Sequence, residues 1–186
     1  MAERSIAPVL KTGDLHGSGG SNPSPSANNQ KGDNMKIFLA MPYSQFTDKN
    51  YVIMPQFRKL FEHLLSELES HGHTCYLAAR RENWGKSYED EKASTKTDYD
   101  AIVACDLVLM VPGIPFSGGT HVEAGWASAH RKKINMFLQK NEFYSPMITG
   151  LNALTDVKYF FYNKFDKDLI ETMVSSVHEK PGKKRS

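Results

Sequence analysis

The sequence has only two cysteines, Cys75 and Cys105, and no cysteine or histidine pair at the spacing of a zinc site or a redox motif. We therefore expect both to be small buried hydrophobic residues in a reducing compartment. No apolar run approaches the ~20 residues that span a bilayer, and the N-terminus lacks the apolar core of a signal peptide. These absences argue against a zinc protein, a thiol oxidoreductase and a membrane protein, and they predict a cytoplasmic protein.

The common glycine-rich signatures of nucleotide binding are also missing. The pair Gly118 and Gly119 fits neither the GxGxxG pattern of dinucleotide-binding folds nor a Walker loop with its lysine. His121 lies beside this pair but has no second ligand at metal spacing. We therefore expect neither a metal nor a cofactor at this loop.

Excess positive charge is confined to the C-terminal end of the chain. The formal net charge is +2, but residues 180–186 carry four positive charges and residues 1–34 carry three charges of each sign, which leaves −2 for residues 35–179. A domain of this charge is not an electrostatic nucleic-acid binder. The short basic tail is typical of a solvated chain end.

The composition predicts one folded domain between two irregular ends. Residues 1–34 are rich in Gly, Ser, Asn and Pro and have too few apolar side chains to offset the entropy of ordering, so we interpret them as a disordered leader or a cloning remnant. Residues 35–179 form the predicted domain, and residues 180–186 the basic tail. With 186 residues, of which 40% are hydrophobic, the chain can bury one sizeable core.

Apolar runs of strand length alternate with segments of helical periodicity along this domain. The strands are expected at residues 36–41, 74–79, 107–111, 134–139 and 157–162. Helices are expected at 55–71, at 92–104, from residue 121, as a short patch near 144–154, and at the C-terminal end. This alternation predicts an α/β fold of the Rossmann-like, flavodoxin-like type, with a five-stranded parallel sheet and helices on both faces.

Three polar loops follow the first three predicted strands, at residues 42–45, 80–85 and 117–123. Because parallel sheets bind ligands at the carboxyl ends of their strands, we expect these loops to converge on one site. The third loop leads into a helix through two glycines, and the free amides and positive dipole end of such a helix suit an anion such as a phosphate. Glu123 would then lie within reach of whatever carries that anion.

Two carboxylates have structural as well as functional interpretations. Residues 120–123 fit a capping box, in which Glu123 would satisfy the amide of a Thr120 cap. Asp98, near the start of its helix, is either a charge favoured by the helix dipole or a second carboxylate of the site. Spacing alone favours the structural interpretation of both, whereas the position of Glu123 at the rim of the sheet favours a site.

Four further residues could bind a nucleotide. Arg80 and Arg81 could clamp a phosphate or stack on a base, and surface salt bridges would explain the pair equally well. Phe38 and Tyr43 could wall a base pocket, although Phe38 lies inside a buried strand and fits the core better.

Several sequence motifs, and their order along the chain, resemble the nucleoside 2-deoxyribosyltransferase superfamily. Within it, they resemble the cytidylate N-glycosidases of peptidyl-nucleoside antibiotic pathways. The similarity spans residues 37–157, and its most specific part is the run Gly-Thr-His-Val-Glu-Ala-Gly-Trp-Ala at 119–127, with Ala-Arg-Arg-Glu-Asn-Trp-Gly at 79–85 as a second match. The resemblance implies that Glu123 faces C1′ of the ribose and that Asp98 assists departure of the base. It places a 5′-phosphate at Ser117, Gly119 and Thr120.

The resemblance also matches Phe38, Tyr43 and Arg81 to pocket positions. Ser44 stands where the relative that acts on hydroxymethyl-CMP carries an arginine, which leaves specificity for modified cytosine open. Transferases of the superfamily carry an acidic residue in the loop before the glutamate, whereas the sequence here is Pro-Phe-Ser-Gly-Gly. This difference favours a hydrolase that binds phosphate.

Three hypotheses follow. The first is a nucleotide N-glycosidase acting on CMP or a close analogue, in which Glu123 is ionised to stabilise the positive charge that develops on the ribose, while Asp98 carries the proton for the base. The second is a deoxyribosyltransferase, and the third is a nucleotide sensor without catalysis. By resemblance, a homodimer or higher homo-oligomer with shared active sites is expected, to which residues 147, 148 and 151 could contribute.

Overall fold

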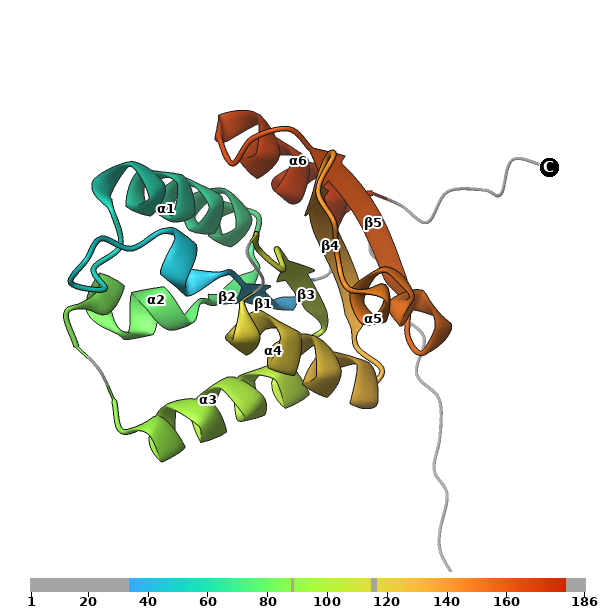
Figure 1. Ribbon diagram of the computed structural model, residues 1–186, viewed down its shortest axis with the longest axis horizontal. Coiled ribbons are helices and arrows are strands. Elements are labelled where there is room, and N and C mark those ends of the chain that lie inside the picture. Colours follow the sequence, from blue (N-terminus) through green and yellow to red (C-terminus); the bar gives the residue numbers. More distant parts are fainter. Residues whose placement is uncertain (1–33, 88, 115–116, 180–186) are drawn as a thin grey trace, which may run out of the picture. The chain divides into compact units, whose positions relative to one another are not determined.

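The protein is described by a computed structural model at residues 34–87, 89–114 and 117–179. The predicted leader, apart from Asn34, and the basic tail lie outside these residues. Five parallel strands form one sheet in the order β2-β1-β3-β4-β5 (Figure 1). Their bounds are β1 Lys36–Ala40, β2 Thr74–Tyr76, β3 Leu107–Met110, β4 Lys133–Gln139 and β5 Val157–Tyr162. The predicted flavodoxin-like α/β architecture is confirmed.

Helices cover both faces of the sheet (Figure 1). One face carries α1 (Pro55–Ser70) and α6 (Lys167–His178), and the other carries α3 (Glu91–Ala104) and α4 (Gly118–Ala129). Strand β1 shows why two cores form, since Ile37 and Leu39 pack into the first layer and the alternate residues Phe38 and Ala40 into the second. None of the helices in the described part of the chain is long and apolar enough to cross a membrane.

Local signals in the sequence set the helix ends. Pro55 occupies the first turn of α1, where its missing N–H is not needed. Asp90 caps α3 by accepting hydrogen bonds from the amides of Lys92 and Ala93. Asp166 caps α6 by accepting one from the amide of Leu169.

Two predicted boundaries were wrong by three residues, and several others by one. Strand β2 ends at Tyr76, and the chain then enters the short helix α2 (Ala78–Arg81). Leu77 and Ala79 are buried there, as they would have been in a longer strand, so the apolar pattern did not distinguish the two. Helix α4 begins at Gly118 rather than His121. The patch predicted near 144–154 consists of α5 (Pro146–Thr149) and the 3-10 helix η3 (Leu151–Ala153).

The order of the strands places a topological switch point between β1 and β3. From β1 the chain crosses through α1 to β2 on one side, and it returns through α3 to β3 on the other. The loops that follow β1 and β3 therefore diverge and leave a crevice at their carboxyl ends. Gly113, at a φ of 83°, lets these loops touch, since an added Cβ would lie 2.5 Å from Cβ of Pro42.

Candidate active site

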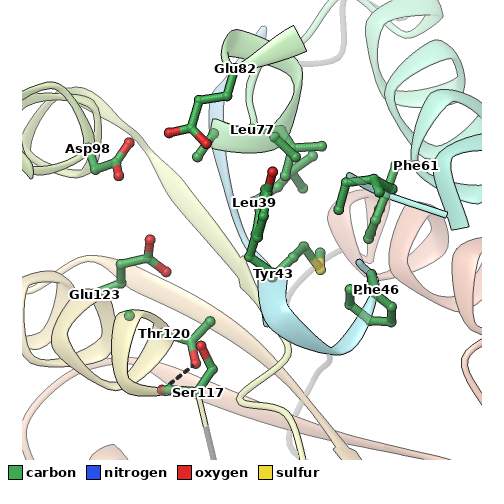
Figure 2. Close-up of a pocket in the computed structure, with 15 residues that line it drawn as sticks. Leu39, Tyr43, Phe46, Phe61, Leu77, Glu82, Asp98, Ser117, Thr120 and Glu123 are labelled. Atoms are coloured by element: carbon green, nitrogen blue, oxygen red, sulfur yellow. Dashed lines mark hydrogen bonds between the residues drawn. The ribbon is translucent and has the colours of Figure 1, made fainter. Parts of the chain in front are cut away.

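A cavity of about 190 Å³ lies at the switch point (Figure 2). Polar residues at the end of α2, on α3 and at the start of α4 line one part of it, and residues of β1, α1, α2 and the loops next to them line the other. The polar lining residues are Glu82, Asp98, Ser117, Gly119, Thr120 and Glu123, and the others are Leu39, Met41, Tyr43, Phe46, Ile53, Phe61, Leu77, Ala78 and Ala79. The cavity thus combines an apolar wall with three carboxyl groups.

The N-terminus of α4 opens at this cavity. Ser117 is its N-cap residue, and the first helical hydrogen bond is donated by the amide of His121 to the carbonyl of Ser117, at 3.2 Å. The amides of Gly118, Gly119 and Thr120 precede that bond and have no acceptor within the helix. Thr120 Oγ1 lies 3.0 Å from the carbonyl oxygens of both Pro112 and Ser117, which fixes the start of the helix.

The two glycines at this helix start are not needed by the fold. Among the described residues, a Cβ added to Gly118 would meet nothing within 4 Å, and one added to Gly119 would meet only Ser117 Oγ at 3.9 Å. Their φ angles lie outside the left-handed region that favours glycine. Space for a ligand against the amides therefore explains these glycines better than folding does.

Glu123 is not a helix cap. Helix α4 starts at Gly118, so Thr120 is its third residue and Glu123 its sixth, which excludes the capping box. Oε2 of Glu123 is buried and has no hydrogen-bond partner among the described residues. Burial, followed by the negative charge of Asp98, raises the pKa of Glu123 to about 8. This shift favours the protonated form of Glu123 in the free protein at neutral pH, whereas the ionised form expected from the sequence is the one that cleavage requires.

Asp98 faces the same cavity from α3 (Figure 2). It is the eighth residue of that helix, so its interpretation as an N-terminal dipole charge is excluded. The hydroxyl of Tyr76 donates a hydrogen bond to Asp98 Oδ1 at 2.6 Å, and Arg81 Nη1 lies 3.5 Å from the same oxygen. The Tyr76 ring stacks on Phe38, with centroids 5.2 Å apart, so the donor is held by the core.

Arg81 lies behind the cavity and binds three carboxylates. Its side chain is 14% exposed, with Nη2 at 2.8 Å from Glu82 Oε1 and Nη1 at 3.4 Å from Glu89 Oε2 and 3.5 Å from Asp98 Oδ1. Arg80 points elsewhere, because its guanidinium bonds to Glu69 and to the carbonyl of Cys75. The two adjacent arginines thus hold the protein's own groups.

The remaining predicted site residues divide into two groups. Tyr43 lines the cavity and donates a hydrogen bond from its hydroxyl to the carbonyl of Tyr51 at 3.1 Å. Phe38 is 1% exposed in the core, and Ser44 is exposed outside the cavity lining. The structure therefore brings together Glu123, Asp98, Tyr43, Ser117, Gly119 and Thr120, and it leaves Phe38, Ser44, Arg80 and Arg81 outside the lining.

Two residues were missed from the sequence: Glu82, which lines the cavity, and Tyr76, which bonds to Asp98. Glu82 stands in the Ala-Arg-Arg-Glu-Asn-Trp-Gly run, which was a signal for it. Tyr76 gave no signal, because its partner Asp98 comes 22 residues later on another element. Within the described ranges, no group of three or more His, Cys, Asp or Glu side chains is placed to hold a metal ion.

Solved structures give the relationship of this fold and site to known proteins. The CMP N-glycosidase BcmB of Clostridium botulinum is 34% identical, with a TM-score of 0.57 over 77% of this chain and 97% of that chain. BlsM is 30% identical, with a TM-score of 0.62 over 76% and 88%. A conserved protein of Enterococcus faecalis V583, 18% identical with a TM-score of 0.54 over 77% and 99%, shares the fold. No protein-family model and no curated protein matches the chain.

The fold and cavity define an α/β protein of flavodoxin-like topology with paired carboxylates at the switch point. The identity to BcmB over nearly all of that chain shows that the protein belongs to the CMP N-glycosidase family. The resemblance noted in the sequence is thereby confirmed.

Proposed function

We propose that the protein is a nucleotide N-glycosidase that hydrolyses a pyrimidine nucleoside 5′-monophosphate, CMP or a close analogue, to free base and ribose 5-phosphate. The name of the family member from Clostridium botulinum supports this. The observation that carries the proposal is Oε2 of Glu123, which is buried without a hydrogen-bond partner among the described residues, on a carboxyl group that faces Asp98. Burying such a group destabilises a fold, and with the capping role excluded, catalysis is the explanation that accounts for it.

The start of α4 supplies the phosphate end of the proposed site. Three helix amides, the positive end of the dipole and the hydroxyl of Ser117 surround space that the two glycines leave open. A phosphate held there fixes the ribose relative to Glu123 one to two turns further along the helix. Binding of this remote group contributes to the rate through orientation of C1′.

The proton held by the carboxyl pair suits cleavage of the N-glycosidic bond. As the bond between C1′ and N1 of the base breaks, the ribose becomes positively charged and the base must gain a proton. We propose that the proton on Glu123 passes to Asp98 when the nucleotide binds and from Asp98 to the base. The ionised Glu123 then stabilises C1′ or bonds to it.

Water completes the reaction. Its oxygen bonds to C1′, displacing Glu123 if a covalent intermediate has formed, and its proton returns to the carboxyl pair. The products are free base and ribose 5-phosphate, and the pair again holds one proton. Tyr76 and Arg81 keep Asp98 aimed into the cavity throughout.

A homo-oligomer is the further part of the proposal. The side chains of Phe143, Met147, Leu154 and Phe161 are 77%, 76%, 61% and 62% exposed, and they lie in and around α5 and the edge strand β5. Exposed apolar side chains on neighbouring elements are typical of a surface that binds another protein, here a second copy of the chain. Light scattering should give a dimer or larger assembly for the wild type and a monomer for Met147→Glu.

Incubation with CMP and isotopically labelled cytosine separates the three hypotheses. A hydrolase releases cytosine and ribose 5-phosphate and leaves no label in the nucleotide. A deoxyribosyltransferase needs a 2′-deoxyribose donor, so a parallel incubation with dCMP tests it, and it incorporates the label into dCMP. A sensor binds CMP, measured by calorimetry, without releasing base, and that result would overturn the proposal.

A further inference from the structure

We propose that Glu82 selects the base by accepting a hydrogen bond from the 4-amino group of cytosine and by repelling the 4-oxygen of uracil. This inference rests on the proposed function, because it assigns the base end of the same cavity. Glu82 lines that cavity together with Asp98 and Glu123.

The succession of polar groups along the cavity matches the parts of a nucleotide. In Figure 2, Ser117 and Thr120 lie at one end, Glu123 follows, and Asp98 and Glu82 lie beyond it with their carboxyl groups directed into the cavity. A phosphate at the first end places C1′ beside Glu123 and the base beside the other two carboxyl groups. Asp98 then meets N3 and O2 of a pyrimidine, and Glu82 meets the substituent at C4.

Glu82 is held in one orientation. Its side chain is 13% exposed, and Arg81 Nη2 donates to its Oε1 at 2.8 Å. Its carbonyl accepts hydrogen bonds from the amides of Gly85 and Ser87, at 3.0 and 3.1 Å. A group fixed by its own ion pair and backbone loses little entropy on binding and cannot easily turn away from an unsuitable base.

The chemistry of an ionised carboxylate decides which base it tolerates. A carboxylate accepts hydrogen bonds and donates none. The 4-amino group of cytosine is a donor, whereas O4 of uracil is an acceptor that would lie unpaired against a negative charge. Sites that bind a substrate donor in this way reject analogues lacking it by about 100-fold or more.

Glu82→Gln tests the assignment, with Glu89→Gln as the matched control. Both glutamates pair with Arg81, but only Glu82 lines the cavity. The ratio of kcat/KM for CMP over UMP should be about 100 or more in the wild type and in Glu89→Gln. It should fall to about 10 or less in Glu82→Gln, whose amide can donate to O4 of uracil.

Two binding measurements keep this test independent of catalysis and of the fold of the variant. Dissociation constants for CMP and UMP in the Glu123→Gln background should show the same change of ratio when Glu82→Gln is added, even if no nucleotide is cleaved. The Glu123→Gln protein should bind the pyrimidin-2-one ribonucleotide, which lacks the 4-amino group, at least 10-fold more weakly than CMP. An unchanged ratio in Glu82→Gln, or equal affinity for CMP and the pyrimidin-2-one nucleotide, would overturn the role of Glu82. Failure of cleavage alone would overturn only the proposed function.

Discussion

The carboxyl of Glu123 lies against Asp98 in a cavity with an apolar wall, and this position opposes its ionisation. Two neighbouring carboxyl groups in such surroundings tend to share one proton. That proton can be transferred to a departing base at neutral pH. The same burial makes Glu123 a destabilising residue, so catalysis and stability respond to it in opposite directions.

The pH dependence of catalysis follows from the proton on Glu123. Since its pKa in the free protein is raised to about 8, kcat/KM for CMP should be retained below pH 8 and fall as the pH rises beyond it. The slope approaches tenfold per pH unit. Initial rates of cytosine release from pH 6 to 9.5 measure this profile, and a rate that keeps rising through pH 9 would contradict the shared proton.

Stability should respond to Glu123 in the same range of pH. Its pKa is raised from 4.5 in the unfolded chain to about 8 in the fold, so burial of Glu123 costs the fold least below pH 4.5, and stability is lost progressively as the pH rises from 4.5 through 8. The free energy of unfolding of Glu123→Gln relative to wild type should therefore increase by roughly 2–4 kcal/mol from pH 5 to pH 8. Urea unfolding at both pH values measures it. The exposed Glu171→Gln is the control and should show no such change.

At the scale of the element, α4 does two things with one segment of sequence. Its first turn presents amides and open space at Gly118 and Gly119, and its second turn carries the carboxyl of Glu123 into the same cavity. The spacing between anion site and carboxylate is thus set by helical geometry rather than by a flexible loop. A rigid spacing of this kind suits a substrate whose phosphate and C1′ are a fixed distance apart.

Gly119→Ala should separate binding from folding at this helix. The methyl group of alanine fits the ligand-free protein, and alanine favours helix more than glycine does. The free energy of unfolding should therefore be unchanged or raised, by up to about 1 kcal/mol. The dissociation constant for CMP should nevertheless increase at least 10-fold, because the methyl group occupies space at the amides. Gly125→Ala, on the same helix and with no described residue within 4 Å of the added methyl group, should leave affinity unchanged. Equal affinities of the two variants would argue against a phosphate at this turn.

The sequence predicted where helices and strands lie better than it predicted where they begin and end, or which side chains bond to one another. The strand at residues 157–162 was predicted to the residue. Glu123 and Asp98 were both identified as candidates. What failed depended on contacts distant in the chain. The start of α4 is fixed by Thr120 bonding to Pro112, and Asp98 is held by Tyr76 on an edge strand, which no local pattern reveals.

At the scale of the whole molecule, the two ends of the sheet differ in chemistry. The carboxyl ends of the strands carry the cavity, whereas three histidines gather near the amino ends, where α1 and α6 terminate. The ring of His178 lies 4.6 Å from that of His71 and 5.3 Å from that of His73. His73 is buried, and its Nδ1 accepts a hydrogen bond from the amide of Met35 at 3.2 Å. Protonation of that nitrogen would break the bond.

The histidine cluster predicts a loss of stability in mild acid. Burial, followed by neighbouring histidines, lowers the pKa of His73 and of His178 below 6.5. Their contribution is therefore complete above pH 6.5 and is lost as the pH falls below it. Because Glu123 contributes an opposite trend to wild type and variant alike, the test is their difference: the unfolding free energy of His178→Gln relative to wild type should increase from pH 7.5 to pH 5. His63→Gln, outside the cluster, should behave as the wild type does, and equal pH dependence in all three proteins would contradict this account.

The measurement that tests the central claim most directly is chromatography of CMP incubated at pH 7 with the wild type, Glu123→Gln and Asp98→Asn. The account predicts equal amounts of cytosine and ribose 5-phosphate from the wild type. It predicts a decrease in kcat of about 1,000-fold or more for Glu123→Gln and a smaller but clear decrease for Asp98→Asn, with CMP still bound by both variants. Cytosine release by Glu123→Gln at the wild-type rate would contradict the assignment of this carboxyl pair as the catalytic centre.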